Sequence, residues 1–477
     1  MGLARSKFTA TLSATLAFAL VACGGGGAPP PTGGGGTPTP TPTPTACSLS
    51  QRQQFVKAAV DEWYLFPELV DNTVNPANFT SLQSYIDALV APARAQSKDR
   101  FFSFITSIAE ENALINSGAS AGFGIRLGFD TGSNRVFVIE AFENANGLGA
   151  GMDRGTELLA IGTTSTNLVT VSSLMASGGP QAVIDALGPS DPGVTRVLRF
   201  RTVGGVTIEA SVTKTSFSLD PVSDRYGIKI IDDGGKKVGY LNLRTFIVDS
   251  AADQLRDAFG QFKAQGVTEV IIDLRYNGGG LVSVAELMGD LMGAGNVGQV
   301  FSFTKLRASK SSENSTQLFA SEGNAIAPTK LAFIGREGTA SASELVANSM
   351  IPYLGANMAL VGTNTFGKPV GQFAFDLAAC DDRLRLVAFK TENADNQGEY
   401  FTGLASVFPN TCRADDDIFV QLGEPGEASI ATALDFLAGR SCTAISGTLR
   451  TTQAVGGRQL LQPERPNTIQ RENPGVF

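Results

Sequence analysis

Residues 269–280 read EVIIDLRYNGGG, an apolar segment that runs directly into three glycines. The segment 269–274 has the length and the β-branched content of a buried strand. Glycines that follow a strand allow a tight turn whose backbone N–H groups another chain can approach closely. Such a turn can bind a phosphate or an oxyanion, or simply reverse the chain. No Lys-Ser or Lys-Thr pair follows it, so the stretch is not a P-loop.

The segments on both sides of this strand alternate between strand and helix patterns. Strands are predicted at 238–243 and 331–335, and residues 250–265 carry apolar side chains at helical spacing before Gly266. We therefore predict an α/β core from about residue 225 to residue 438.

A second polar stretch, GTASASE at 338–344, lies between the strand predicted at 331–335 and a helix. Ser341 would sit at the positive end of this helix, whose free N–H groups stabilise developing negative charge. The same residues also fit a plain helix start, in which a serine or Thr339 caps the helix and Glu344 completes a capping box.

A third stretch, TFGKPVGQ at 365–372, places Lys368 in a glycine-containing loop with apolar neighbours. A lysine in such a loop is usually a solvated surface residue when it is considered alone.

The 477 residues include no histidine. This excludes a Ser-His-Asp triad, a Cys-His pair and any metal site that depends on imidazole. A side chain that accepts a proton in catalysis must therefore be Lys, Asp, Glu, Tyr or Cys. The formal net charge of −8 argues against a nucleic-acid partner, and no cofactor or metal is predicted.

The first 22 residues have the pattern of a signal peptide, with basic residues followed by an apolar run at 8–22 that is too short to span a bilayer comfortably. The run ends in LVAC, which resembles a bacterial lipobox with Cys23 as the lipid-modified residue. The alternative is an ordinary signal peptide followed by an incidental cysteine. Residues 24–46 are rich in Gly, Pro and Thr and predict a spacer. We expect a cell-envelope lipoprotein, on the periplasmic face of the outer membrane if the source bacterium has two membranes.

Four cysteines follow the spacer, at Cys47, Cys380, Cys412 and Cys442. An even number in an oxidising compartment predicts disulfides, and four cysteines allow three pairings. Their order along the chain favours Cys380–Cys412, which flank a strand-rich stretch, and Cys47–Cys442, which open and close the folded part.

Three other segments complete the organisation. Residues 47–116 have helical spacing and predict a small helical domain, and residues 117–216 show short strands, for example at 135–139, separated by glycine turns. Residues 443–477 contain few apolar side chains and predict an extended or disordered tail.

The region 117–216 resembles a PDZ domain. GFGI at 122–125 is similar to the carboxylate-binding loop of that domain, and residues 143–162 are similar to its helix-and-strand segment. The backbone amides of Phe123, Gly124 and Ile125 are therefore expected to bind the end of a peptide that adds a strand beside them.

Together, DLRYNGGG at 273–280, TASASE at 339–344 and TFGK at 365–368 resemble the carboxyl-terminal processing peptidase family. The resemblance covers about residues 50–440. It implies a multidomain fold, with an α/β core of the ClpP/crotonase-like spiral ββα type at 217–442, an inserted PDZ domain and an N-terminal helical domain. It also implies polypeptide substrates with exposed C-termini, and leaves the oligomeric state open.

The resemblance assigns roles to particular residues of this chain. Ser341 matches the nucleophile, Lys368 the general base and Gln372 the residue that orients the lysine. The amides of Gly279 and Ala342 match the oxyanion hole. The sequence departs from the family pattern at Gly278, where a proline is usual, and in a slightly longer spacing between the serine and the lysine.

This mechanism makes a physical demand on Lys368. A free lysine has a pKa of about 10.4, so burial must lower the pKa to about 7 before the amine can accept a proton at neutral pH. Gln372 is uncharged and can hold the amine without favouring its ammonium form, as a carboxylate would.

Two other functions remain open on the sequence. One is a non-catalytic lipoprotein that uses the PDZ-like region and the core to bind peptides or other ligands. The other is an acyl-transfer or CoA-type enzyme, because the expected core also resembles crotonase-like folds.

Overall fold

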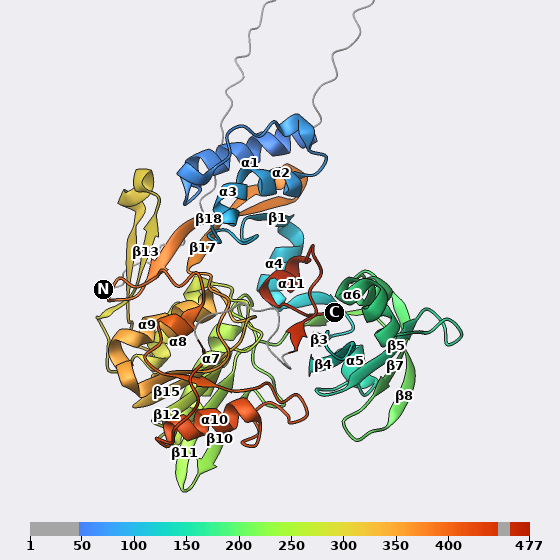
Figure 1. Ribbon diagram of the computed structural model, residues 1–477. Helices are drawn as coiled ribbons and strands as arrows, with labels where there is room; N and C mark the ends of the chain where they lie inside the picture. The colour runs from blue at the N-terminus through green and yellow to red at the C-terminus, as the bar shows by residue number, and fades with distance from the viewer. Residues whose placement is uncertain (1–46, 447–457) are drawn as a thin grey trace, which may run out of the picture.

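The computed structural model of the protein describes residues 47–446 and 458–477 (Figure 1). It has three parts, which we call the cap (residues 47–117 and 370–392), the β-domain (119–218) and the core (219–369 and 393–446). The signal segment, Cys23 and the spacer lie outside the described residues. Within the described ranges, no helix is both long and apolar enough to cross a membrane.

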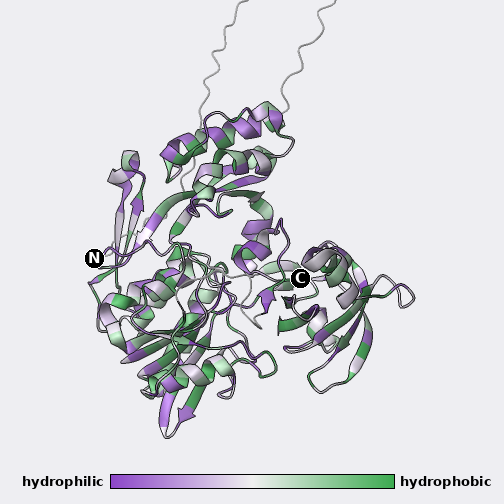
Figure 2. Ribbon diagram, viewed as in Figure 1, coloured by the Kyte–Doolittle hydropathy of each residue, from purple (hydrophilic) through white to green (hydrophobic). Residues whose placement is uncertain are grey.

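The core is built on a six-stranded sheet with the strand order β10-β11-β12-β15-β16-β19. Its strands are β10 (Ile228–Asp233), β11 (Lys236–Asn242), β12 (Glu269–Asp273), β15 (Lys330–Gly335), β16 (Met358–Gly362) and β19 (Thr411–Arg413). The β10–β11 pair is antiparallel, and every pair from β11 to β19 is parallel. A parallel sheet needs apolar cover on both faces, and Figure 2 shows apolar residues along its central strands.

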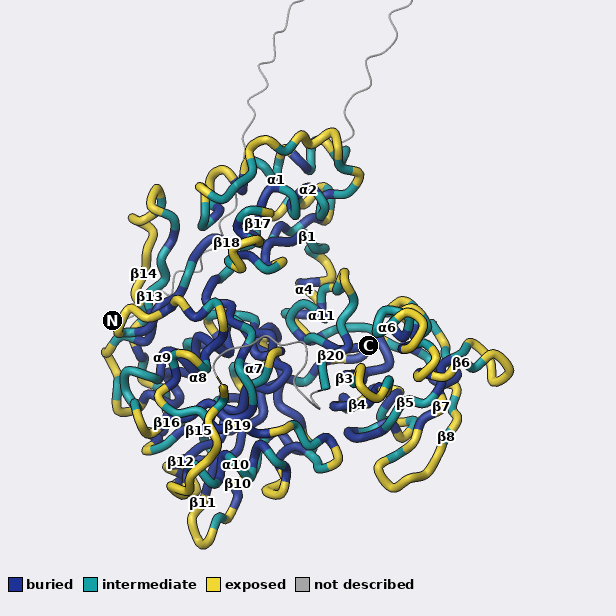
Figure 3. The backbone as a smooth tube through the Cα atoms, in the orientation of Figure 1, coloured by how far each residue is buried: buried dark blue, intermediate teal, exposed yellow. Residues whose placement is uncertain are grey.

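Helices cover both faces of this sheet. On one face lie α7 (Ala251–Ala264), α8 (Val282–Met292) and α9 (Ala342–Leu354), whose apolar side chains share one buried cluster with β12 and β15. On the other face lies α10 (Ala428–Leu437). Figure 3 shows the result: the central strands are buried, whereas the tip of the β10–β11 hairpin is exposed. The strands predicted at 238–243 and 331–335 and the helix predicted at 250–265 are confirmed.

The cap is not an independent helical unit. It contains α1 (Leu49–Trp63), α2 (Leu82–Leu89), α3 (Ala91–Ala95) and α4 (Ile108–Ser117). It also contains strand β1 (Phe104–Ser107), which pairs with β18 (Asp382–Glu392) from the distant end of the chain. The antiparallel partner of β18 is β17 (Val370–Leu377), and the helices pack on this hairpin. The same sheet takes β13 (Val300–Leu306) and β14 (Ser315–Leu318) from the core.

The β-domain holds a sheet with the order β20-β3-β4-β5-β7-β8, in which β6 also pairs with β5. Its strands are β3 (Ile125–Asp130), β4 (Arg135–Ala141), β5 (Glu157–Gly162), β6 (Val169–Thr170), β7 (Thr195–Arg201) and β8 (Thr207–Thr213). Its helices are α5 (Asn146–Gly149) and α6 (Val171–Leu187). Strands β2 (Ala119–Gly122) and β9 (Thr215–Ser218) pair with each other where the domain joins the rest of the chain.

The predicted cysteine pairing is wrong. The structure joins Cys47 to Cys380 and Cys412 to Cys442, each with Cα atoms 5.3 Å apart. Cys380 lies at the turn of the β17–β18 hairpin in the cap, whereas Cys412 lies in β19 of the core sheet. These two cysteines flank β18 in sequence but lie in different parts of the protein, so proximity along the chain did not predict proximity in space.

The predicted disorder of the tail is also wrong for residues 458–477; residues 447–457 lie outside the described part. The segment 458–477 contains β20 (Gln459–Leu460) and helix α11 (Thr468–Glu472). Strand β20 pairs with β3 of the β-domain. The segment has few apolar side chains, but those at Leu461, Ile469, Val476 and Phe477 are buried against other parts of the protein. Its order comes from these contacts and not from a core of its own.

Candidate active site

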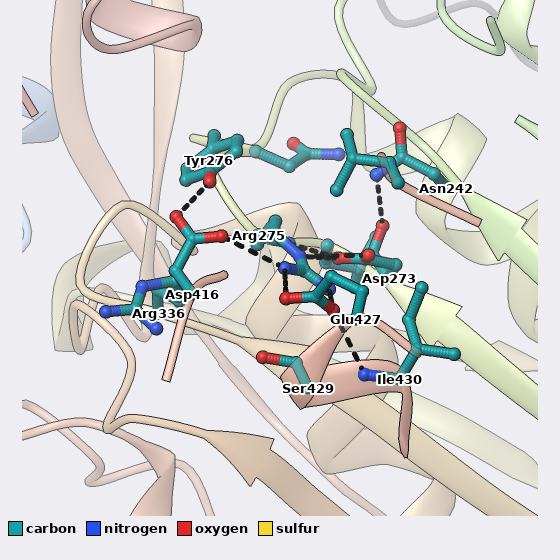
Figure 4. Close-up of polar contacts among 12 residues, drawn as sticks. Asn242, Asp273, Arg275, Tyr276, Arg336, Asp416, Glu427, Ser429 and Ile430 are labelled. Atoms are coloured by element: carbon teal, nitrogen blue, oxygen red, sulfur yellow. Dashed lines mark hydrogen bonds and ion pairs between the residues drawn. The ribbon is translucent and has the colours of Figure 1, made fainter. Parts of the chain in front are cut away.

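The strand β12 ends in a buried ionic network (Figure 4). Arg275 has no exposed side-chain surface, and its Nε donates to both carboxylate oxygens of Asp273 at 2.9 Å. Its Nη1 and Nη2 donate to the two oxygens of Glu427 at 2.9 and 2.8 Å. Burial raises the pKa of Asp273, although Arg275 acts in the opposite direction. Paired charges fix the position of the loop that follows β12.

Asp416 connects this network to the β-domain. It accepts hydrogen bonds from Tyr276 Oη and from Arg275 Nη1, the latter at 3.1 Å. Arg154, from the β-domain, donates to it at 2.7 Å. Burial alone would raise the pKa of Asp416, but these arginines and Arg336 hold it well below its usual range. The carboxylate therefore stays ionised and joins the β-domain to the core. It does so beside residues 278–280, which we call the glycine loop.

The glycine loop approaches the start of α9 closely. Gly279 has a φ of +114°, which a residue with a side chain rarely adopts. A β-carbon built on Gly279 would lie 2.7 Å from Cβ of Ser341 and 3.1 Å from the Ala342 nitrogen. The structure thus brings together Gly279, Ser341 and Ala342. The Gly279 N–H donates to Asn277 Oδ1 at 2.9 Å, so this amide already has a partner.

Ser341 lies where β15 and its loop enter α9, and it has a φ of +57°. This backbone conformation is unfavourable for a residue with a side chain and persists only where the surroundings impose it. The Ser341 N–H donates to Glu344 Oε2 at 3.2 Å, which is part of the capping box. The helix-cap interpretation and the nucleophile interpretation therefore describe the same residue.

Lys368 is buried, as the predicted mechanism requires. Its Nζ donates to Gln372 Oε1 at 2.9 Å and lies 5.1 Å from the centre of the Phe102 ring. The amide nitrogen of Gln372 donates to the Phe102 carbonyl, which fixes the orientation of its side chain. Burial lowers the pKa of Lys368 against the opposing effect of nearby carboxylates. Burial therefore weakens the preference of the amine for the charged form.

Glu344 joins the serine and lysine segments, a role that the sequence did not reveal. Its Oε2 accepts from the Ser341 N–H and from the Lys368 N–H, the second at 2.7 Å. Its Oε1 accepts from Thr365 Oγ1 at 2.5 Å and from the Gly367 N–H at 2.7 Å. The capping-box spacing predicted only the first of these bonds. Burial raises the pKa of Glu344 to about 7 although all four hydrogen bonds lower it.

The cap also contacts residues 363–369, the loop that carries Lys368. Arg100 Nη2 donates to the Phe366 carbonyl at 2.6 Å and to the Gly367 carbonyl. Its guanidinium carbon lies 4.2 Å from the centre of the Phe366 ring. A residue of the cap thus holds the loop segment immediately before Lys368. Among the described residues, no group of three or more Cys, Asp or Glu side chains is arranged to hold a metal ion.

Comparison with known proteins identifies the domain that carries this site. The family model for peptidase family S41 matches residues 237–405, a range that includes Gly279, Ser341, Lys368 and Gln372. The chain contains a peptidase family S41 domain. Its fold is S41 protease-like, with mixed α/β content and several domains.

The named relatives of the S41 domain are processing proteases. The carboxyl-terminal-processing protease of Synechocystis sp. is 25% identical over 330 residues, which are 68% of this chain and 70% of the relative. The chloroplastic C-terminal processing peptidase of Tetradesmus obliquus is 26% identical over 361 residues, 69% of this chain and 71% of the relative. The crystal structure of a protein from Bacteroides fragilis assigned to the S41 proteases has a TM-score of 0.63 at 22% identity. It covers 81% of this chain and 97% of that protein.

The predicted peptide-binding residues lie outside the S41 match, in the β-domain. The N–H groups of Gly124 and Ile125 donate to the oxygen of Phe477 at 2.9 and 3.2 Å, whereas the Phe123 side chain is buried in the domain core. The structure therefore separates them from Ser341 and Lys368 and places the end of the described tail against them.

Replacing Glu344 with glutamine should lower kcat of the S41 domain by about 10- to 100-fold with little change in KM. The amide has one acceptor oxygen where the carboxylate has two, so the Ser341 and Lys368 segments lose hydrogen bonds of about 1–3 kcal/mol. Steady-state kinetics on a peptide substrate measures the effect. Glu337→Gln, at an exposed position of the preceding loop, is the control and should behave as the parent. Equal rates for the two variants would show that Glu344 does not position the site.

Proposed function

We propose that this protein is a serine endopeptidase of the carboxyl-terminal processing type, with Ser341 as nucleophile and Lys368 as general base. Membership of family S41 supports a serine peptidase, and the names of the relatives support the processing of polypeptides. The assignment of the two residues is specific to this proposal.

The environment of Lys368 is the observation that carries the proposal. A lysine with no role in catalysis would normally extend to water, but this side chain is buried and its amine is held by the neutral amide of Gln372. A lowered pKa increases the share of the unprotonated amine, which is the form that can accept a proton.

In the proposed reaction the two residues act in sequence. The unprotonated Nζ of Lys368 takes the hydroxyl proton of Ser341 as Oγ attacks the scissile carbonyl carbon, and the ammonium then returns the proton to the leaving amine. A water molecule, deprotonated by the same lysine, attacks the acyl-enzyme and releases the serine. Gln372 keeps the amine directed and adds no negative charge that would stabilise the ammonium form.

The negative oxygen of the tetrahedral intermediate needs N–H donors. The amides of Gly279 and Ala342 are the candidates, because the glycine loop approaches the start of α9 closely. The Gly279 N–H must first leave Asn277 Oδ1, so we propose that substrate binding accompanies this exchange.

The β-domain would select substrates as a PDZ domain does. The backbone groups of β3 that β20 and residues 475–477 bond in this structure would pair with an added strand, and the amides at 124 and 125 would bind its end. We further propose export and lipid anchoring through Cys23, in the periplasm-facing outer membrane of a bacterium with two membranes. The disulfides Cys47–Cys380 and Cys412–Cys442 are compatible with an oxidising compartment.

The chain from Cys23 onward, incubated with an unfolded protein, tests the proposed activity. Mass spectrometry of the products should show new ends concentrated near the C-terminus of the substrate, and a chelator should not change the yield. A thioester assay run in parallel covers the acyl-transfer alternative. Thioester hydrolysis without peptide cleavage would overturn the proposal, as would binding of the unfolded protein without any cleavage.

A further inference from the structure

The segment 458–477 touches the β-domain, the cap and the S41 site at once. In Figure 1 it is the dark red chain whose helix α11 lies beside α4 and whose end reaches β3. Its contacts with α4 and β3 are direct, through Thr468 Oγ1, which donates to Glu110 Oε2 at 2.8 Å, and through β20. One continuous segment therefore joins the peptide-binding edge to the candidate active site.

At the β-domain this segment occupies the place of a bound peptide. The Phe477 N–H donates to the Ile125 carbonyl at 2.9 Å, and the Leu127 N–H donates to the Gly475 carbonyl at 2.8 Å, so residues 475–477 extend the sheet at β3. The Phe477 side chain is 2% exposed and lies in the apolar cluster formed by β3 and α6. An added strand with one side chain buried in a pocket is how an extended peptide binds a sheet edge.

At the candidate active site, which we also call the S41 site, the same segment accepts a hydrogen bond from a backbone N–H of the glycine loop. The Gly278 N–H donates to the Glu472 carbonyl at 3.0 Å. A β-carbon on Gly278 would lie only 2.6 Å from that oxygen, so the two chains are in close contact. Glu472 ends a helical turn, whereas a peptide bond that is to be cut must lie extended beside the nucleophile. The segment therefore lies against the loop beside Gly279 in a helical conformation, which does not present a bond for cleavage.

The charge of Glu472 also acts on the base. Four charged groups influence Lys368: Glu472, Asp99 and Glu344 raise its pKa, and Arg385 lowers it. Glu472 is the largest of these charge effects and favours the ammonium form, which cannot accept the serine proton. Lys368 in turn opposes the rise in the pKa of Glu472 that burial causes.

We propose that residues 458–477 are an intramolecular ligand that fills the peptide groove of the β-domain and holds the S41 site at rest. A polypeptide that places a large apolar side chain where Phe477 lies releases the site by replacing this segment on β3. The inference rests on the proposed function of Ser341 and Lys368 for its inhibitory part only. The alternative is that the segment is a permanent strand of the β-domain.

Competition with the tethered segment determines which polypeptides can bind to β3. A tethered segment has an effective concentration on the order of millimolar at its site. A free chain must therefore bind β3 well enough to compete, which excludes chains without an apolar side chain that can take the place of Phe477 in the cluster.

A binding measurement tests the groove without depending on catalysis. A fluorescent peptide with the sequence of residues 468–477, TIQRENPGVF, is titrated into the full chain carrying Ser341→Ala, with and without Phe477→Asp. The aspartate places a charge in the apolar pocket and should release the segment, so the double variant should bind the peptide at least tenfold more tightly. Glu464→Ala, at an exposed position of the same segment, should leave the affinity unchanged. Equal affinity for the proteins with and without Phe477→Asp, or no binding to either, would overturn the proposal.

Activity tests the inhibitory part. With Ser341 intact, Phe477→Asp should raise kcat/KM for an unfolded protein about tenfold. If a thermal melt shows that this substitution impairs folding, a chain that lacks residues 468–477 replaces it, and the same increase is expected. Tighter peptide binding with unchanged cleavage would overturn inhibition by the segment. Tighter binding with no cleavage by any of these proteins would instead contradict the proposed function, and would leave the segment as the ligand of the groove.

Discussion

Replacing Ser341 with alanine should lower kcat for peptide cleavage by at least about 10⁴-fold, because no other group takes the place of the attacking oxygen. Substrate binding should persist, because the residues that we propose for peptide binding, 123–125, belong to the β-domain and not to the core. The rate of appearance of new peptide ends under saturating substrate measures the effect. Ser349→Ala is a matched control: Ser349 is a buried serine of the same helix whose hydroxyl has no hydrogen-bond partner in the described structure, and its loss should not change kcat.

Substitutions of Lys368 test the proposed base in the same kinetic assay. Lys368→Ala should reduce kcat as far as Ser341→Ala does, and the double variant should be no slower, because the two residues act as one unit. Lys368→Arg should also be inactive, since a guanidinium stays protonated and cannot accept a proton. In the parent, activity should rise with pH as Lys368 loses its proton, with a midpoint below the usual lysine value of about 10.4. A Lys368→Ala variant with near-parental rates would exclude this lysine as the base.

Among the substitutions proposed for this protein, Arg275→Ala should cause the largest decrease in the free energy of unfolding. The substitution leaves Asp273 and Glu427 buried without their partner, and breaking a buried ion pair in this way costs about 3–5 kcal/mol in the free energy of unfolding. Chemical denaturation followed by circular dichroism measures the change. Lys57→Ala removes a pair with Asp61 on the exposed side of α1 and should leave the stability unchanged, because surface pairs contribute little.

A second substitution separates the charge effect from loss of packing. Arg275→Met keeps most of the side-chain volume but not the charge, so it should destabilise the protein about as much as Arg275→Ala does if the unpaired carboxylates are the cause. A much milder effect of Arg275→Met would show that packing, and not charge, accounts for the loss.

Local patterns in the sequence predicted much of the core. The apolar segment before Gly278 becomes β12, and the run at 331–335 becomes β15, because a buried parallel strand has the same signature wherever it lies. The meeting of Gly279 with Ser341 was predicted by a resemblance and not by physics, since no local pattern states which loops converge.

The failures have a common physical cause. The pairing of Cys47 with Cys380 and the order of residues 458–477 both depend on contacts between distant parts of the chain. The tail has too few apolar residues for a core, but it needs none, because each apolar side chain enters a surface that other parts have already formed. Glu344 was missed for the same reason: three of its four hydrogen bonds reach residues more than twenty positions away.

The shared oxygen of Glu344 has a consequence for thermal motion. Helix α9 and the loop that carries Lys368 fluctuate, as all elements do, but one carboxylate oxygen accepts from the backbone N–H of both Ser341 and Lys368. A displacement of either segment therefore pulls the other in the same direction. Reaction rates depend on the relative placement of the two groups and not on where they lie in the molecule. Such correlated movement would preserve the distance between Ser341 and Lys368 while the surrounding protein moves.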